Sequence, residues 1–279
     1  MCGIFGVIDH PSIDRDRFKN ALALLHHRGP DFTDVKFWER AAFGFTRLAI
    51  QDLSPNGNQP MTLLDDSLTI VFNGEIYNHK ILREKLKSEG VQFFSRSDTE
   101  VILHAFHCWG WEKTLHTIEG MFGMVIYDHR KGTFYLARDR FGQKPLFFSQ
   151  DSKLGFVFAS ELKSIVAYVG SANMDPRSCM NPLFTTGLSP RGKSCFRGIE
   201  QLEPGELLQY QLASGKIIRK KYFQVGDLVS EDLYQELNGY SQEKMLETYE
   251  KVFDESVQLH LLSDAPVASL FSAGVDSSL

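Results

Sequence analysis

A cysteine at position 2 separates the initiator methionine from Gly3 to Ile8, a short apolar run of β-forming residues. If Met1 is removed, as the small following side chain permits, Cys2 carries a thiol and a free α-amine on one residue. The amine titrates near ~8 and the thiol near ~8.5, so the amine can accept the thiol proton around neutral pH. The position allows a nucleophile at the start of a strand, but the position alone favours the alternative, a buried and inert cysteine.

Hydrophobic periodicity predicts strands at both ends of the first 223 residues and helices between them. The predicted strands are 3–8, 42–50, 68–72, 121–127, 133–138, 146–149, 157–160, 207–211 and 217–223, and the predicted helices are 15–26, 80–89 and 99–109. A turn is predicted at Asn73-Gly74, because this pair readily adopts positive φ. The order of elements favours two stacked antiparallel sheets covered by helices.

The last third of the chain has a different character. Residues 170–194 are predicted to be a loop with one helical turn at 181–186, and residues 224–240 a polar, acidic linker. A helix follows Ser241, and a buried strand is predicted at 266–271. The apolar face of that helix comprises Met245, Tyr249, Val252, Phe253 and Val257.

Composition excludes several classes of partner. The net charge of −5 and the pI near 6.0 argue against nucleic acid, and no apolar run approaches the roughly 20 residues of a membrane span. The start of the chain lacks the basic region of a signal peptide, which predicts a cytoplasmic protein. The four cysteines show no zinc or disulfide spacing. His104 and His107 share a helix face without a third ligand, so no metal site is predicted.

Five further motifs follow one another along the chain. They are Arg28-Gly29-Pro30-Asp31, Arg47-Leu48-Ala49-Ile50, Asn73-Gly74-Glu75-Ile76-Tyr77-Asn78, Ser97-Asp98-Thr99-Glu100 and Arg138-Asp139-Arg140-Phe141-Gly142. With Cys2, they make the chain resemble the class II glutamine amidotransferases, and within them the glutamine-hydrolysing asparagine synthetases. The resemblance implies an α+β fold, the four-layer αββα N-terminal-nucleophile sandwich, over residues 2–223. After the linker, residues 241–279 would begin an α/β ATP-pyrophosphatase domain, which is incomplete here.

The same resemblance assigns roles in binding glutamine. Arg47 offers a planar fork for the α-carboxylate, and Asp98 offers a counter-charge for the α-ammonium group. The side-chain amide of Asn73 and the backbone N–H of Gly74 would form the oxyanion hole. The pocket would be completed by Leu48, Ala49, Ile50, Gln51 and Glu75. The Arg28 motif would support the loop that closes over the site.

Each of these signals has a simpler interpretation when it stands alone. Arg47 would then form a surface ion pair, Asp98 would cap a helix, and Asn73-Gly74 would be a hairpin turn. Their occurrence together, in family order and with Cys2 at the terminus, favours the functional interpretation.

The segment Ser272 to Ser278 follows the predicted strand and resembles the pyrophosphate loop of enzymes that adenylate a carboxylate. ATP binding is therefore expected at Phe271, Ser272, Gly274, Asp276 and Ser277. The family usually has glycine where this chain has Ala273, which adds a methyl group beside the phosphates. ATP and Mg²⁺ are implied for the full synthetase, whereas glutamine hydrolysis needs no cofactor.

The predicted reaction is hydrolysis of L-glutamine to glutamate and ammonia. In the full family architecture, ammonia passes to a β-aspartyl-adenylate made from aspartate and Mg·ATP, and the product is asparagine. One alternative keeps the glutaminase but changes the acceptor to a sugar or peptide carboxylate; another is a non-enzymatic interaction module. Because the chain stops at Leu279, a complete glutaminase and an incomplete synthetase are expected, and a homodimer is compatible with the family.

Overall fold

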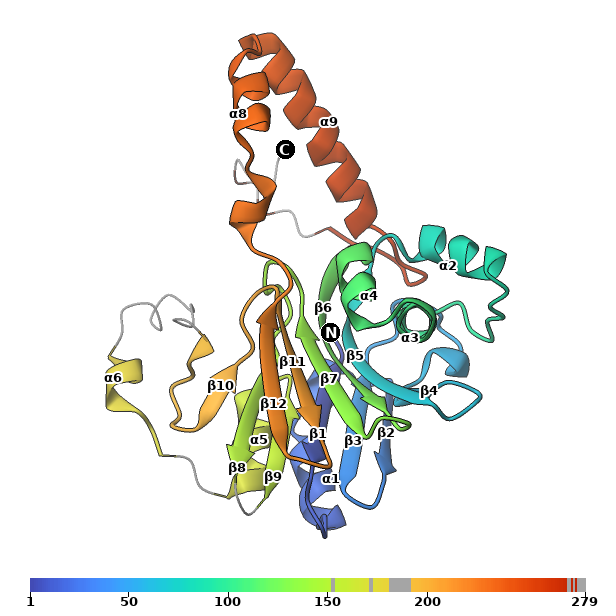
Figure 1. The fold of residues 1–279 in the computed structure, drawn as a ribbon, viewed down its shortest axis with the longest axis vertical. Coiled ribbons are helices and arrows are strands. Elements are labelled where there is room, and N and C mark those ends of the chain that lie inside the picture. The colour runs from blue at the N-terminus through green and yellow to red at the C-terminus, as the bar shows by residue number, and fades with distance from the viewer. Residues whose placement is uncertain (152–153, 171–172, 181–191, 270–271, 273, 275–279) are drawn as a thin grey trace.

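The computed structural model describes residues 1–151, 154–170, 173–180, 192–269, 272 and 274 (Figure 1). Two six-stranded antiparallel sheets form its centre. In the first, the strands lie in the order β10 (Ile199–Gln201), β8 (Phe147–Asp151), β9 (Gly155–Ala159), β1 (Gly3–Ile8), β3 (Ala41–Arg47) and β2 (Phe32–Phe37). In the second, the order is β12 (Lys216–Lys221), β11 (Glu206–Gln211), β7 (Thr133–Arg138), β6 (Gly120–Asp128), β5 (Leu68–Ile76) and β4 (Met61–Thr62).

Helices cover the outer face of each sheet. The first sheet packs against α1 (Arg15–Ala23) and α5 (Leu162–Val169), and the second against α2 (His79–Ser88), α3 (Asp98–Trp109) and α4 (Trp111–Thr117). Between the sheets, a core of large apolar side chains joins Phe43 and Phe45 of β3 to Val71 of β5 and Phe134 of β7. Burial of this apolar surface is the main force that holds the layers together. The predicted αββα sandwich is confirmed.

The helices begin where their sequences supply caps. Asp14 precedes α1, and its carboxylate accepts hydrogen bonds from the N–H groups of Asp16 and Arg17, both at 3.0 Å. Ser97 caps α3 through a 3.1 Å bond from the Thr99 N–H to its hydroxyl oxygen. Asp98 is therefore the first residue of the helix rather than its cap.

The turn predicted at Asn73-Gly74 is wrong. Both residues continue strand β5, in which Asn73 pairs with Gly123 and Gly74 with Phe122 of β6. A Cβ atom at position 74 would collide with the carbonyl oxygen of Met121. Glycine is thus needed for the close approach of two strands, not for positive φ.

The strand predicted at 266–271 is also wrong where it can be compared: residues 266–269 adopt no strand, and 270–271 lie outside the described residues. Val267 is 59% exposed. A strand is stabilised by pairing with a neighbour, and the described part of the chain provides none for this segment. The helical turn predicted at 181–186 likewise lies outside the described residues.

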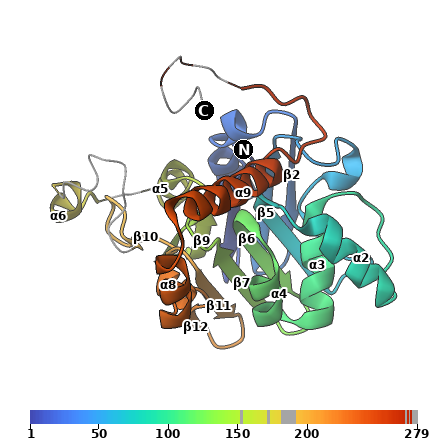
Figure 2. The same ribbon diagram turned by 90° about the horizontal axis from the view of Figure 1, so that it is seen from above.

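The segment after the sandwich is more helical than predicted. The proposed linker contains a 3₁₀ helix (Val225–Leu228) and α8 (Glu231–Asn238), and α9 (Gln242–His260) follows the Ser241 cap. Figure 1 shows α8 leading away from the sheets and α9 returning to them, and Figure 2 shows α9 crossing above the sandwich. The predicted apolar face of α9 is exposed at Met245, Tyr249, Val252, Phe253 and Val257. Among the described helices, none has the length and apolar character needed to cross a membrane.

Candidate functional site

A cavity of about 60 Å³ lies beside Cys2, where β1 begins and where β3 and β5 end. It is lined by Met1, Cys2, Phe45, Arg47, Leu48, Ile50, Gln51, Gly57, Gln59, Phe72, Asn73, Gly74, Glu75, Ser97, Asp98, Thr99 and Lys144. Every glutaminase residue predicted from the sequence lines this cavity except Ala49. The backbone N–H of Ala49 instead donates to Asp31 Oδ2 at 2.8 Å, which fastens the neighbouring loop.

Cys2 is partly buried and packs against the core between the sheets. Its Sγ lies 3.6 Å from the carbonyl oxygen of Leu48, to which the thiol donates. Burial raises the pKa of the Cys2 thiol, because the low-dielectric surroundings disfavour the thiolate. The resting thiol is therefore protonated at neutral pH, and a base must remove its proton during an attack.

Met1 is retained in this structure, so the free α-amine belongs to Met1 and not to Cys2. Burial lowers the pKa of that amine, and the nearby charge of Arg28 acts in the same direction. Met1 is 51% exposed, and it also lines the cavity. Removal of Met1 would widen the cavity and leave the amine on Cys2, next to the thiol.

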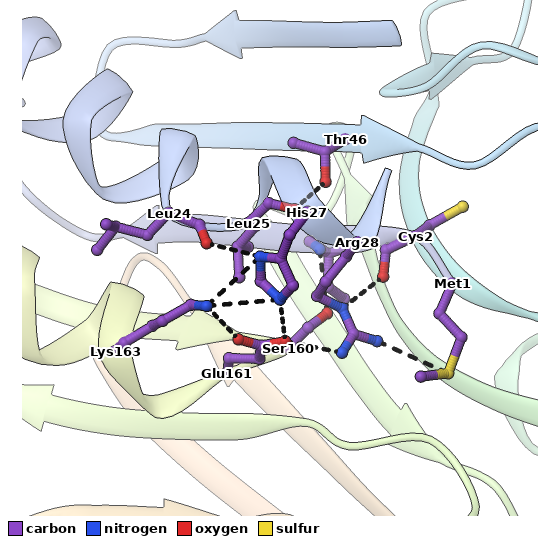
Figure 3. Close-up of polar contacts among 11 residues, drawn as sticks. Met1, Cys2, Leu24, Leu25, His27, Arg28, Thr46, Ser160, Glu161 and Lys163 are labelled. Atoms are coloured by element: carbon purple, nitrogen blue, oxygen red, sulfur yellow. Dashed lines mark hydrogen bonds and ion pairs between the residues drawn. The ribbon is translucent and has the colours of Figure 1, made fainter. Parts of the chain in front are cut away.

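Arg28 fixes the backbone of the cysteine (Figure 3). Its Nε donates to the carbonyl oxygen of Cys2 at 3.0 Å, and its Nη1 donates to Glu161 Oε1 at 2.9 Å. His27 Nε2 and Lys163 Nζ contact the same carboxylate at 3.0 and 2.9 Å. Partial burial alone would raise the pKa of Glu161, but the hydrogen bonds from Lys163, Arg28 and His27 lower it to about 2. The first motif thus anchors Cys2 to the start of α5.

Arg47 is buried at the end of β3 and organises the loop that follows. Nη1 donates to the Ser54 carbonyl at 2.9 Å and to Asn58 Oδ1 at 2.7 Å, and Nη2 donates to the carbonyls of Gln51, at 3.2 Å, and Asp52. All these acceptors are neutral. They leave the buried positive charge without a counter-ion in these bonds, and such a charge favours an anionic ligand.

Asp98 also lines the cavity and lies in the first turn of α3. Its Oδ2 accepts a 2.9 Å hydrogen bond from the backbone N–H of Ile76. Burial raises the pKa of Asp98 to about 6 in spite of this bond. A ligand ammonium group would stabilise the ionised carboxylate, so the site is suited to a cation at this end.

Two buried amide side chains in the lining lack expected hydrogen bonds. Asn73 Nδ2 finds no partner among the described residues, and neither Nε2 nor Oε1 of Gln51 does. Asn73 is 1% exposed. An unsatisfied buried amide group costs about 1–3 kcal/mol, so its presence calls for an explanation. One explanation is that Asn73 Nδ2 is placed to donate a hydrogen bond to an oxygen atom of a ligand.

Sequence reasoning missed Lys144, which is buried and lines the cavity. Burial lowers the pKa of Lys144, and Glu75 opposes this shift. The position of Lys144 depends on Asp139, whose carboxylate accepts the N–H groups of Gln143 and Lys144, both at 2.9 Å, and of Phe141 at 3.0 Å. The Arg138-to-Gly142 motif was visible in the sequence, but its role in placing Lys144 depends on these contacts.

The predicted nucleotide loop is mostly outside the described residues. Phe271, Asp276 and Ser277 belong to the undescribed part, and only Ser272 and Gly274 are described. Within the described residues, no group of three or more His, Cys, Asp or Glu side chains is placed to hold a metal ion.

Comparisons with known proteins place these features in context. A family model described as "Glutamine amidotransferase domain" matches residues 1–223, and one described as "Asparagine synthase" matches residues 248–279. Asparagine synthetase (glutamine-hydrolyzing) 3 of Bacillus subtilis is 32% identical over 284 residues, which cover 100% of this chain and 44% of the relative. Amidase chyE of Penicillium rubens is 31% identical over 294 residues, with 100% and 42% coverage.

A solved structure of a B. subtilis glutamine phosphoribosylpyrophosphate amidotransferase, complexed with ADP and GMP, has a TM-score of 0.60 at 19% identity. It covers 79% of this chain and 49% of that protein, and the likeness shows the fold. The chain spans less than half the length of the two curated relatives named above.

Proposed function

Because this chain belongs to the glutamine amidotransferase domain family, we propose that it hydrolyses L-glutamine to glutamate and ammonia at the cavity beside Cys2. One observation carries the proposal. The buried amide nitrogen of Asn73, which has no partner among the described residues, lines the same cavity as the Cys2 thiol. A nucleophile and an unengaged hydrogen-bond donor on one cavity are what acyl transfer from an amide requires.

The reaction follows from these positions once Met1 is removed. The α-amine of Cys2 accepts the thiol proton while Sγ attacks the carboxamide carbon of glutamine. The resulting oxyanion accepts hydrogen bonds from Asn73 Nδ2 and the Gly74 N–H. The ammonium of Cys2 then protonates the leaving nitrogen, and ammonia departs. Water hydrolyses the remaining thioester, which releases glutamate and restores the thiol.

The two charged side chains orient the substrate in this proposal. Arg47 binds the α-carboxylate of glutamine, and Asp98 binds its α-ammonium group. Glu75, Leu48, Ile50 and Gln51 complete the pocket. Support comes from Arg47, whose hydrogen bonds described above all go to neutral acceptors, and from the buried carboxylate of Asp98, since both residues line one cavity.

The test is glutamine turnover by the purified chain after intact-mass measurement has shown the loss of Met1. Glutamate release by this protein, and none by Cys2→Ala, is the expected result. A matched control is Cys108→Ala, because Cys108 is exposed on α3 and does not line the cavity. Turnover that survives Cys2→Ala, or is absent from processed wild-type protein, would overturn the proposal.

We further propose that the ammonia serves ATP-dependent amidation of aspartate in the complete enzyme. The match of residues 248–279 to the asparagine synthase family and the names of the bacterial relatives support this acceptor. The similarity to a protein named as an amidase keeps another carboxylate acceptor as the second candidate. A complete protein that forms AMP with aspartate, and not with other carboxylates, would decide for aspartate.

The family match implies ATP for the complete synthetase, and Mg²⁺ is part of the proposal. We propose residues 2–223 as the glutaminase domain, 224–240 as the connection and 241–279 as the start of the synthetase domain. ATP would bind at Phe271, Ser272, Gly274, Asp276 and Ser277.

A cytoplasmic location agrees with the free thiols, because a nucleophilic cysteine requires a reducing compartment. The charge of −5 supports a protein without nucleic-acid partners, and sedimentation would test whether the chain forms the homodimer that is compatible with the family.

A further inference from the structure

The segment that follows α9 contacts the loop next to the nucleophile. We call residues 48–54, which connect β3 to the 3₁₀ helix Pro55–Gly57, the site loop. The backbone N–H of Asp264 donates to the carbonyl oxygen of Ile50 at 2.9 Å. In return, the backbone N–H of Asp52 donates to Asp264 Oδ2 at 2.8 Å. These two hydrogen bonds bracket Gln51, the one site-loop residue between them.

The bracketed part of the loop forms part of the cavity. Ile50 and Gln51 line it, and earlier in the same site loop the carbonyl oxygen of Leu48 accepts a hydrogen bond from the Cys2 thiol. The carbonyls of Gln51 and Asp52 also hold the guanidinium of Arg47. A shift of the loop would therefore move the proposed carboxylate-binding group.

Asp52 adopts a backbone conformation that needs support. Its φ is 49°, in the left-handed region that an L side chain rarely occupies. Its carboxylate accepts the N–H of Arg96 at 2.7 Å and the hydroxyl of Ser54 at 2.6 Å. Its own N–H is satisfied by Asp264. Such a conformation persists only when its surroundings hold it, and Asp264 supplies one of the contacts that do so.

A second contact places the end of α9 near β5, the strand that carries Asn73 and Gly74. The rings of His260 and Tyr77 lie 4.5 Å apart between centroids, and Tyr77 directly follows β5. Beyond the helix, the Ser263 hydroxyl oxygen accepts the N–H of Ala265 at 3.0 Å, which fixes the turn that presents Asp264. The last residue of α9 thus contacts the residue after β5, and the segment after α9 contacts the site loop through Asp264, which is 212 residues from Asp52 in sequence.

We propose that Asp264 is a positioning residue for glutamine binding. It holds the site loop so that the Gln51 and Asp52 carbonyls keep Arg47 in place. The inference rests on the proposed glutaminase function and adds to it a dependence of glutamine affinity on the segment after α9. Any movement of that segment would then change the affinity of the glutamine site.

The test compares Asp264→Ala, which removes the carboxylate, with Asp264→Asn, which keeps an acceptor for the Asp52 N–H. Asp254→Ala is the matched control, because Asp254 is an exposed aspartate on α9. We expect Asp264→Ala to raise KM for glutamine roughly five- to tenfold with kcat changed less than about twofold. Asp264→Asn should restore KM to within about twofold of wild type, and Asp254→Ala should leave both constants unchanged.

Hydrogen exchange at the Asp52 amide gives a readout that is independent of turnover. Protection of this amide in wild type, and its loss in Asp264→Ala, is the expected result. Folded Asp264→Ala with wild-type KM would overturn the inference, as would a fall in kcat at constant KM. If that variant does not fold, Asp264→Glu decides, since its longer side chain displaces the acceptor: a wild-type KM would overturn the inference. Wild-type protein without turnover, but with the expected exchange pattern, would overturn the proposed glutaminase alone.

Discussion

The carboxylate of Asp98 accepts a hydrogen bond from the backbone N–H of Ile76, with 2.9 Å between Oδ2 and N. This bond joins the first turn of α3 to the end of β5, the strand that carries Asn73 and Gly74. The group proposed to bind the ammonium end of glutamine is therefore tied to the strand proposed to stabilise its reacting end. Such coupling holds the two ends of the substrate at a fixed separation, which favours reaction.

Chemical labelling should distinguish Cys2 from the other three cysteines. A glutamine analogue with an electrophilic side chain should add one equivalent to Cys2 in processed protein, because only this thiol lies in the cavity. Protein that retains Met1 should react much more slowly, since its Cys2 amine is part of a peptide bond. Peptide mass mapping identifies the site. Equal labelling of Cys108, Cys179 or Cys195 would contradict the prediction.

Gly74→Ala should damage both the fold and the site. The added methyl group would overlap the Met121 carbonyl and approach the Phe122 Cα to 2.7 Å, so β5 and β6 must separate. We expect a loss of about 1–3 kcal/mol in the free energy of unfolding and little remaining turnover. Denaturant unfolding measures the first effect. Gly226→Ala is the control, because no atom lies within 4 Å of a Cβ built there.

Asn73→Ala should separate catalysis from stability. Its Nδ2 has no partner among the described residues, so the substitution removes no bond made by that nitrogen in the free protein. The oxyanion that it would stabilise forms only during reaction. We therefore expect kcat to fall about 10²–10³-fold with KM nearly unchanged. Steady-state kinetics together with thermal unfolding test both halves, and a large loss of stability with normal kcat would refute the assigned role.

Much of the sandwich was predictable because its signals are local. The strand Gly3–Ile8 has the predicted bounds, and α3 begins beside its predicted start because Ser97 supplies a cap. Helix α5 was missed, although Leu162, Ile165 and Tyr168 are spaced for one helix face. The edge strand β2 was missed for a different reason: Phe32–Phe37 contains charged residues and is partly exposed, so its apolar pattern is weak.

Site residues were predictable where the residue type itself suits the chemistry. Cys2, Arg47 and Asp98 have such side chains, and the cavity contains all three. Lys144 was not predictable in this way, because its place depends on the buried carboxylate of Asp139 and on the fold of the following turn. The turn predicted at Gly74 was wrong because the constraint on this glycine comes from β6, which is more than 40 residues away in sequence.

Asp98→Asn should stabilise the protein near neutral pH while it weakens glutamine binding. The pKa of Asp98 is raised to about 6 in the folded protein, above the roughly 3.9 of an unfolded chain. A raised pKa means that the stability contributed by the protonated carboxyl is present below pH ~4 and is lost as pH rises through about 6. Asparagine is neutral and can still accept the Ile76 N–H, so it avoids that loss.

The difference in unfolding free energy between Asp98→Asn and wild type should therefore be about 1–3 kcal/mol at pH 7 and should disappear near pH 4. Denaturant titrations across this range measure it, and an equal difference at both ends would contradict the assignment.

Wild-type kcat/KM for glutamine should fall as pH drops below about 6, because the neutral carboxyl no longer attracts the substrate ammonium group. The kcat profile should break at lower pH, since a bound ammonium group lowers the pKa of Asp98. Asp98→Asn should lose this acidic limb and show a KM raised roughly tenfold or more at every pH.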